Sequence, residues 1–392
     1  MIAPHPQRFN SPPQNCLPLG PDIPIMEWLS QRGGTIGIMT ETAPHLAREA
    51  EAAPAYARAE ASGAAYAALD LGTNNCRLLI ASPNATGFRV LDSFSRVVRL
   101  GEGLGSSGQL SAASMDRALA ALGACADKLG RRPLRGFEAV ATEACRQASN
   151  GAAFIARVEA ETGIRLRIIT GREEAELAME SCAALLEPGD RRALLFDIGG
   201  GSTEIAWIRA AARPGDVPEL IGYISLPVGV VTLAERCGAA CFTEAGFFAV
   251  VDEVAARLEA FDRLHCIGQE IHAGGVRLMG TSGTVTTLAG VVMALPRYRR
   301  PLVDGSTLDC EAADAALGDL FAMGRAELAA HPCVGPERVD YVLPGCAIYA
   351  AIRRIWPTKS LRVADRGLRE GILLRMMRAD REAARRSPPR RR

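Results

Sequence analysis

One pattern occurs twice in this chain: AALDLGTNNCRLLI at residues 67–80 and LLFDIGGGSTEIAW at residues 194–207. In each copy an apolar run predicts a strand that carries an aspartate near its end, Asp70 or Asp197. A turn rich in glycine and small polar residues follows, and a second apolar run predicts the returning strand. Because the two hairpins share the same internal spacing, we expect two similar half-molecules that face one cleft.

Both turns have the composition of a phosphate-binding loop. Glycines allow backbone N–H groups to converge on an anion, and serine, threonine and asparagine add side-chain donors. An aspartate repels phosphate unless a divalent cation lies between them, so Asp70 and Asp197 are candidate metal ligands. The alternative is a pair of ordinary β-hairpins, but two copies with equal offsets favour phosphate binding. The candidate phosphate-binding residues of the turns are Gly72, Thr73, Asn74, Asn75, Gly199, Gly200, Gly201 and Ser202.

The composition narrows the chemistry. The chain has 392 residues, 48% hydrophobic and 23% charged, as in a soluble globular protein with room for two domains. The net charge of +1 argues against a nucleic-acid partner bound through bulk charge. Lys128 and Lys359 are the only lysines, and neither lies in a G-K-[ST] context, which excludes a Walker-type P-loop. Phosphate charge must therefore be balanced by arginine or by a metal ion.

The cysteines and the apolar segments indicate where the protein works. The sequence has 11 cysteines with no C-x-x-C spacing, which is typical of buried free thiols in a reducing compartment. No apolar run reaches the roughly 18 residues of a transmembrane helix, and the N-terminus lacks the pattern of a signal peptide. We therefore expect a cytoplasmic protein without a membrane partner.

The chain divides into four parts by composition and periodicity. Residues 1–64 are rich in Pro, Ala and Gly and are expected to be a disordered N-terminal extension. Strands and helices then alternate, which indicates an α/β protein, with a first domain at 65–178 and a second at 179–378. The last predicted helix ends near Met377 and could pack back on the first domain. The basic, proline-broken stretch at 379–392 is expected to be a disordered tail.

Three further segments hold candidate site residues, each with an ordinary alternative. Arg146 follows a predicted strand end, where ligands of α/β sheets bind; the alternative is a surface salt bridge. Glu174 lies in the first turn of a predicted helix, where acidic residues usually stabilise the helix dipole; it could instead point into the cleft. Gly283 and Thr284 open another helix, whose N-terminus could bind an anion or could simply be capped.

Five motifs in this order give the chain a resemblance to the exopolyphosphatase / guanosine pentaphosphate phosphohydrolase (Ppx/GppA) family. The resemblance covers roughly residues 66–378 and implies two ribonuclease-H-like domains of the actin / sugar kinase / heat-shock ATPase fold around a central cleft. Long family members carry a C-terminal domain with a His-Asp pair; this chain has no such dipeptide and resembles the short, two-domain form. The motifs are 70–74, 142–150, 173–175, 197–204 and 365–371.

The resemblance implies an activity and roles for individual residues. The activity is processive hydrolysis of the terminal phosphate of inorganic polyphosphate with Mg²⁺ or another divalent cation such as Mn²⁺, in a homodimer. By motif match Glu174 is similar to the catalytic base, Glu204 to a second carboxylate that holds metal or water, and Arg146 to an arginine that grips phosphate. Asn75 stands where the family usually has serine. The expected metal ligands are Asp70, Asp197 and Glu204.

Three other functions stay open on the sequence. A guanosine pentaphosphate 5′-phosphohydrolase would share the same motifs. An ATP-dependent kinase of the same fold is a second alternative, although Glu174 and Glu204 match hydrolase positions and no separate sugar-binding segment is evident. The third is a non-catalytic sensor that binds polyphosphate or an alarmone without releasing phosphate.

Overall fold

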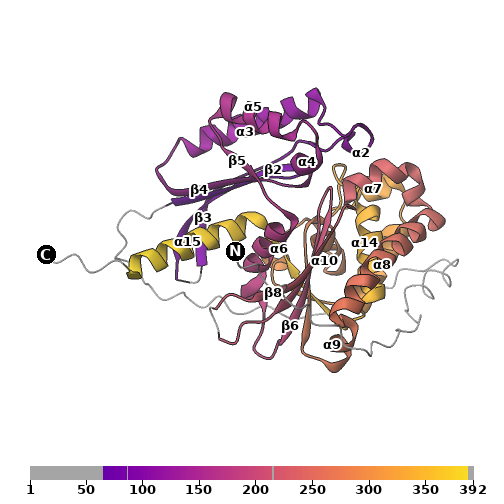
Figure 1. Cartoon of the computed structure of the whole chain (residues 1–392). Coiled ribbons are helices and arrows are strands. Elements are labelled where there is room, and N and C mark those ends of the chain that lie inside the picture. The colour runs from indigo at the N-terminus through magenta and orange to yellow at the C-terminus, as the bar shows by residue number, and fades with distance from the viewer. Residues whose placement is uncertain (1–64, 86, 214–215, 387–392) are drawn as a thin grey trace, which may run out of the picture.

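Two mixed sheets, each with helices on its faces, make up the molecule (Figure 1). The computed structural model describes residues 65–85, 87–213 and 216–386. The N-terminal extension expected at 1–64 therefore lies outside the described residues.

The first sheet begins with the first copy of the repeated pattern. Its three N-terminal strands run antiparallel to one another, and the last two run parallel to the first strand. The hairpin turn at Gly72–Asn75 comes at the end of the sheet where β1 stops. From one edge to the other the strands are β3 (Gly87–Val97), β2 (Asn75–Asn84), β1 (Ala65–Leu71), β4 (Leu134–Ala141) and β5 (Leu166–Ile168).

The second sheet repeats this topology from the second copy of the pattern. Its first three strands pair antiparallel with their neighbours, two later strands run parallel to the first strand, and one short antiparallel strand is added at an edge. The repeated order is that of a ribonuclease-H-like domain, so the expected fold of two such domains is confirmed. The strands are β8 (Glu219–Leu226), β7 (Thr203–Arg209), β6 (Arg192–Ile198), β9 (Val276–Thr281), β11 (Ser360–Ala364) and β10 (Thr307–Asp309).

Helices cover the outer face of each sheet (Figure 1). Alternate residues of β1, such as Leu69 and Leu71, pack under α3 (Ala112–Leu129) and α5 (Gly151–Thr162). None of the described helices is long and apolar enough to cross a bilayer. The helices packed on the second sheet are α7 (Val230–Cys237), α8 (Glu244–His265), α9 (Ile267–Ala273), α10 (Gly283–Val292), α12 (Cys310–Ala322), α13 (Arg325–Ala330) and α14 (Val342–Ile355).

Two crossing helices, α6 (Gly171–Cys182) and α15 (Leu368–Arg386), lie between the sheets. α15 follows the last strand of the second sheet but packs Ile372 and Leu373 on the first sheet. α6 follows the last strand of the first sheet but packs Met179 and Cys182 on the second. The inner faces of the two sheets are thus covered by helices exchanged between the halves.

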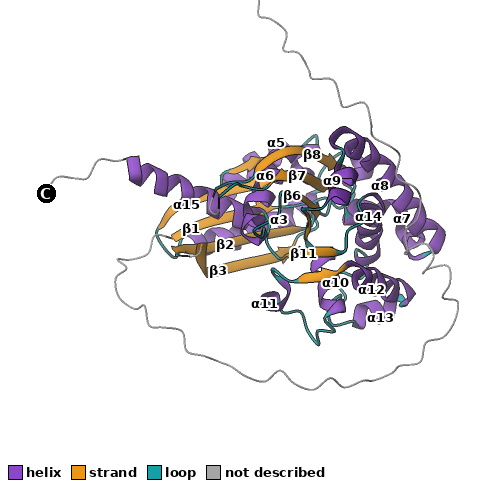
Figure 2. Cartoon of the chain, turned by 90° about the horizontal axis from the view of Figure 1, so that it is seen from below, coloured by secondary structure: helices purple, strands orange, loops and turns teal. Residues whose placement is uncertain are grey.

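The disordered tail expected at 379–392 is wrong for residues 379–386, because α15 continues to Arg386. Asp380 holds this part of the helix: its carboxylate accepts a hydrogen bond from the Tyr66 hydroxyl at 2.6 Å and pairs with Arg135 at 2.5 Å. Figure 2 shows α15 at the opposite end of the molecule from α7 and α8. Residues 387–392 lie outside the described part of the chain.

Candidate functional site

The two glycine-rich turns have the same backbone closure. The N–H of Gly72 donates to the carbonyl of Asn75, and the N–H of Gly199 donates to the carbonyl of Ser202, both at 2.9 Å. The turns also contact each other, since a Cβ added to Gly201 would lie 2.6 Å from the Thr73 hydroxyl oxygen. A side chain at position 201 would displace Thr73, so the close approach of the turns depends on this glycine, whose counterpart in the first copy is Asn74.

Hydrogen bonds on the far side of each turn fix the direction of its amides. The carbonyls of Gly199 and Gly200 accept from Val230 and Val231 at the start of α7. In a trans peptide the next N–H points away from the carbonyl, so the amides of Gly200 and Gly201 point away from α7. The carbonyls of Thr73 and Asn74 are likewise held, by the backbone after β3. The amides of both turns therefore face away from these bonds, an orientation in which backbone N–H groups are available to an anion.

These turns line a cleft with a volume of about 820 Å³. The structure brings most of the predicted site residues together along its walls, but Glu204 and Arg146 do not line it. The segment after β11 and the start of α10 complete the walls. The predicted residues that line the cleft are Asp70, Gly72, Thr73, Asn74, Asn75, Glu174, Asp197, Gly199, Gly200, Gly201, Ser202, Gly283 and Thr284.

The two hairpins differ in the residue opposite the aspartate. Asp70 of β1 is paired across the ladder with Arg77 of β2, whereas Asp197 of β6 is paired with Glu204 of β7. Burial raises the pKa of Asp197 to about 6. Burial and the Asp197 charge raise the pKa of Glu204 to about 7, although two hydroxyls donate to its Oε1, from Ser202 at 2.6 Å and Ser225 at 2.9 Å. Negative charge is therefore concentrated in the second half.

Glu174 reaches the cleft from the first turn of α6. Thr170 caps this helix by accepting from the Glu173 N–H at 3.2 Å. Glu173 and Glu176 turn away from the cleft and pair with arginines on the surface. Glu174 is only 8% exposed, and burial together with the Glu204 charge raises its pKa well above the ordinary value. Of these three acids, only Glu174 lines the cleft together with the glycine-rich turns.

Arg146 lies beside Glu174 in a short helix, α4 (Glu143–Gln147). Its Nη1 donates to the Ile169 carbonyl at 2.7 Å and is 3.4 Å from Glu174 Oε2, and its Nη2 pairs with Glu143. The side chain lines a smaller pocket that adjoins the cleft. Arg146 is therefore in a salt bridge, and one of its partners is the candidate base.

The sequence analysis did not single out the arginines on the cleft wall, among them Arg77 and Arg369. Arg77 lies in the first copy of the repeated pattern, and Arg369 lies in the motif at 365–371. Among the described residues, the Arg77 side chain is in no hydrogen bond or ion pair, and the Arg369 side chain has only a 3.8 Å contact with Glu370. Burial lowers the pKa of Arg369. The sequence pattern could have marked Arg77, because this residue is opposite Asp70 in the predicted hairpin.

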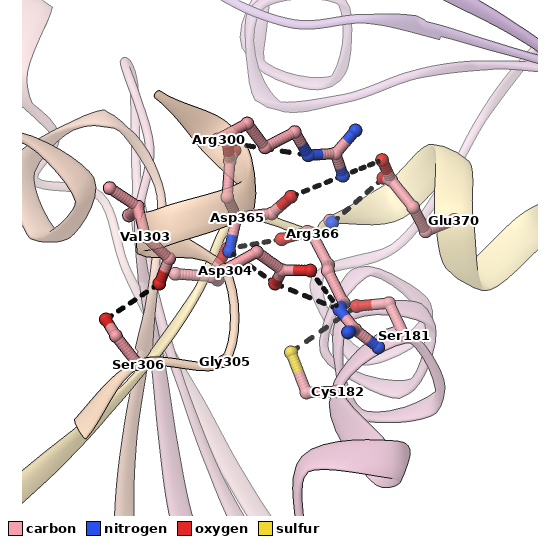
Figure 3. Close-up of polar contacts among 12 residues, drawn as sticks. Ser181, Cys182, Arg300, Val303, Asp304, Gly305, Ser306, Asp365, Arg366 and Glu370 are labelled. Atoms are coloured by element: carbon pink, nitrogen blue, oxygen red, sulfur yellow. Dashed lines mark hydrogen bonds and ion pairs between the residues drawn. The ribbon is translucent and has the colours of Figure 1, made fainter. Parts of the chain in front are cut away.

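Neighbouring arginines hold the backbone that carries Arg369 (Figure 3). Arg300, at the start of α11 (Arg300–Val303), donates to Glu370 at 3.0 Å, and Glu370 in turn accepts from the Gly367 N–H at 3.0 Å. Arg366 donates to both oxygens of Asp304 at 3.0 Å. Because these two arginines are paired, Arg77 and Arg369 are better placed to meet a bound anion.

Ser282, before α10, is a further residue that the sequence analysis missed. Its φ of 91° is one that residues with a side chain rarely adopt, and such strain concentrates at functional sites. Its hydroxyl is buried and has no hydrogen-bond partner among the described residues. Together with Gly283 and Thr284 it forms a third polar segment on the cleft wall.

The expected metal-ligand set is not preformed. Among the described residues no group of three or more His, Cys, Asp or Glu side chains is placed to hold a metal ion, so Asp70, Asp197 and Glu204 do not make one site. Glu204 has its Oε1 occupied by serine hydroxyls. Asp70 fits better, because its Oδ1 is buried with no hydrogen-bond partner in the described residues. Mg²⁺ usually takes one or two carboxylates and completes its shell with water and phosphate oxygens.

Paired ribonuclease-H-like domains whose glycine-rich turns line one cleft define a protein of the actin-like ATPase fold. Within that class, the chain belongs to the Ppx/GppA phosphatase family, whose model matches residues 79–380. It is accordingly a hydrolase, and the resemblance found in the sequence is confirmed.

Three solved structures are similar over most of their length. An exopolyphosphatase-like protein is 28% identical with a TM-score of 0.70, over 81% of this chain and 98% of that one. A Ppx/GppA family member from Aquifex aeolicus is 25% identical with a TM-score of 0.67, over the same shares. An exopolyphosphatase from Cytophaga hutchinsonii is 24% identical with a TM-score of 0.71, over 80% of this chain and 98% of that one, and supports the fold alone.

Proposed function

We propose that the protein is an exopolyphosphatase that hydrolyses terminal phosphates of inorganic polyphosphate, one after another. The observation that carries this proposal is the composition of the cleft: two phosphate loops, the buried carboxylate Glu174, and the arginines Arg77 and Arg369 line one space. A polymer of phosphate needs repeated donors and cations along its path. Arg77 and Arg369 would supply such donors and positive charges to the phosphates that follow the terminal one.

Glu174 is the proposed general base. It is buried beside the loops, and its raised pKa strengthens it as a proton acceptor once it is ionised. Arg146, 3.4 Å from its Oε2, would hold the carboxylate in place. Glu204, fixed by two serine hydroxyls, would keep a water molecule or Glu174 oriented. The loop amides would stabilise charge on the phosphoryl group as it is transferred to water.

A divalent cation, Mg²⁺ or Mn²⁺, is proposed to bind at Asp70 and Asp197. The unpartnered Asp70 Oδ1 supports this assignment. When bound, such a cation offsets the charge of the carboxylates and polarises phosphate oxygens.

The test is a phosphate-release assay on long-chain polyphosphate, guanosine pentaphosphate and ATP, with Mg²⁺ and with excess chelator. Polyphosphate is expected to be the preferred substrate, with activity lost in chelator. Glu174→Gln should lower turnover at least about 100-fold, the usual contribution of a general base, while polyphosphate binding is retained. Release at the wild-type rate by this variant would refute the role of Glu174.

One observation favours guanosine pentaphosphate as a second candidate substrate. Tyr341 and Glu337 also line the cleft. An aromatic ring can stack on a base, and a carboxylate can accept from the N–H groups of guanine. A lower KM for guanosine pentaphosphate than for polyphosphate, raised by Tyr341→Ala, would support this alternative.

A further inference from the structure

A second pocket of about 540 Å³ adjoins the cleft on the side of Glu174 and Arg146. Among the described residues, Glu143 is the only one that lines both the cleft and this pocket. Glu143 therefore occupies the position where the two spaces meet.

Glu143 is held firmly in that position. Its Oε2 accepts from Arg146 and its Oε1 accepts from the Gln147 side chain, so both oxygens are engaged by residues of α4. The residue is only 8% exposed. On its other side, a Cβ added to Gly201 would lie 3.2 Å from the Glu143 Cγ, so the side chain packs against the second phosphate loop. Glu143 thus bridges the first domain and the loop of the second.

The pocket behind Glu143 could accept a phosphate group. Arg146 lines it, and so do Gly171 at the first turn of α6 and the ring of Tyr223. The Arg172 guanidinium lies over that ring, 5.7 Å from its centroid. A guanidinium and the N-terminal turn of a helix both favour anions. Glu143 lines both this pocket and the cleft, so its side chain lies at the boundary between the two spaces.

We propose that Glu143 is a specificity-determining residue that stops the polyphosphate chain after its terminal phosphate. This inference rests on the proposed function. With Glu143 present, the terminal phosphate reaches the loops and can go no further, so the bond cleaved is the last one. Without it, the chain end can pass into the second pocket and place an internal bond at the loops.

The chemistry is the same for either bond. Water supplies the oxygen that bonds to the attacked phosphorus, and the bridging P–O bond breaks. The bridging oxygen leaves with the electron pair on the other fragment and takes up the proton that water has lost. What changes is the fragment released: orthophosphate from the last bond, pyrophosphate or tripolyphosphate from an internal one.

The experiment measures the size of the products that purified wild-type protein, Glu143→Ala, Glu143→Asp and Glu143→Gln release from long-chain polyphosphate in Mg²⁺. The alanine variant opens the passage and should lose about 10-fold or more of the preference for orthophosphate over oligophosphate products, as when a specificity contact is removed. The aspartate variant, shorter by one methylene, should show a smaller loss. The glutamine variant keeps the volume and should release orthophosphate only.

The remaining outcomes separate this inference from the proposed function. If the folded alanine variant releases orthophosphate only, or nothing while the glutamine variant is active, Glu143 merely positions Arg146 and the inference is wrong. If the alanine variant does not fold, orthophosphate as the sole product of the aspartate variant refutes it. Wild-type protein that releases no phosphate from polyphosphate refutes the proposed function itself.

Discussion

Replacing Gly371 with alanine is expected to destabilise the protein and to slow its reaction. α15 crosses α6 at this glycine, and a Cβ placed there would lie 2.8 Å from the Leu177 carbonyl carbon, closer than real Cβ atoms come. The helices must separate, and such overpacking costs about 1–3 kcal/mol, against a gain of about 1 kcal/mol from alanine's helix propensity. We expect the overpacking to outweigh this gain, with a net loss of up to about 2 kcal/mol in the free energy of unfolding.

The matched control is Gly123→Ala in α3, where a Cβ would meet no atom within 4 Å. This variant should be about 0.5–1 kcal/mol more stable than wild type. Urea unfolding measures both. Because α6 also carries Glu174, a shift of about 1 Å could lower turnover about 100-fold in the Gly371 variant alone. If the Gly371→Ala protein has the stability and turnover of wild type, the tight contact between α6 and α15 is refuted.

Arg77→Gln and Arg369→Gln are each expected to raise the KM for polyphosphate about 10-fold, from the loss of a charge-assisted hydrogen bond, whereas the exposed Arg165→Gln should not; equal KM values would contradict the assignment. In chelator, the free energy of unfolding should fall as the pH rises from about 4.5 to 7, because the raised pKa of Glu204, about 7, makes the folded protein bind more protons than the unfolded chain over this range. Glu204→Gln should remove about 3 kcal/mol of this decline, at 1.36 kcal/mol per pKa unit. If urea titrations of this variant show the same change of unfolding free energy with pH as wild type, Glu204 is not the group responsible.

The repeated hairpin could be predicted because its determinants are local. Apolar alternation, the strand-end aspartates and the glycines of each turn are read directly from neighbouring positions, and they place both hairpins and their turns correctly. The cleft between the two hairpins could also be predicted, because a duplicated hairpin implies two similar half-molecules that face each other. α14, by contrast, was not predicted, because nearly all of its residues are buried and it shows no polar face along its length.

The parts that could not be predicted depend on contacts between distant segments. The Arg146 side chain donates to the Ile169 carbonyl and does not line the cleft. The last turns of α15 are held by the bonds of Asp380 to Tyr66 and Arg135. The orientation of Glu174, by contrast, could be narrowed to two choices. Glu173 pairs with Arg167, six positions earlier, and Glu176 pairs with Arg172, four positions earlier, whereas Glu174 has no arginine at either spacing before it.

The exchange of α6 and α15 between the halves has a consequence for synthesis on the ribosome. The inner face of the first sheet, with Tyr66, Ala68 and Leu79, is covered by α15, which is translated after all the strands of both sheets. The N-terminal half therefore emerges with an apolar surface that it cannot bury alone, and such surfaces are prone to aggregate. A fragment that stops before Leu368 should need a chaperone to stay in solution. Adding α15 as a separate peptide should restore the solubility of this fragment.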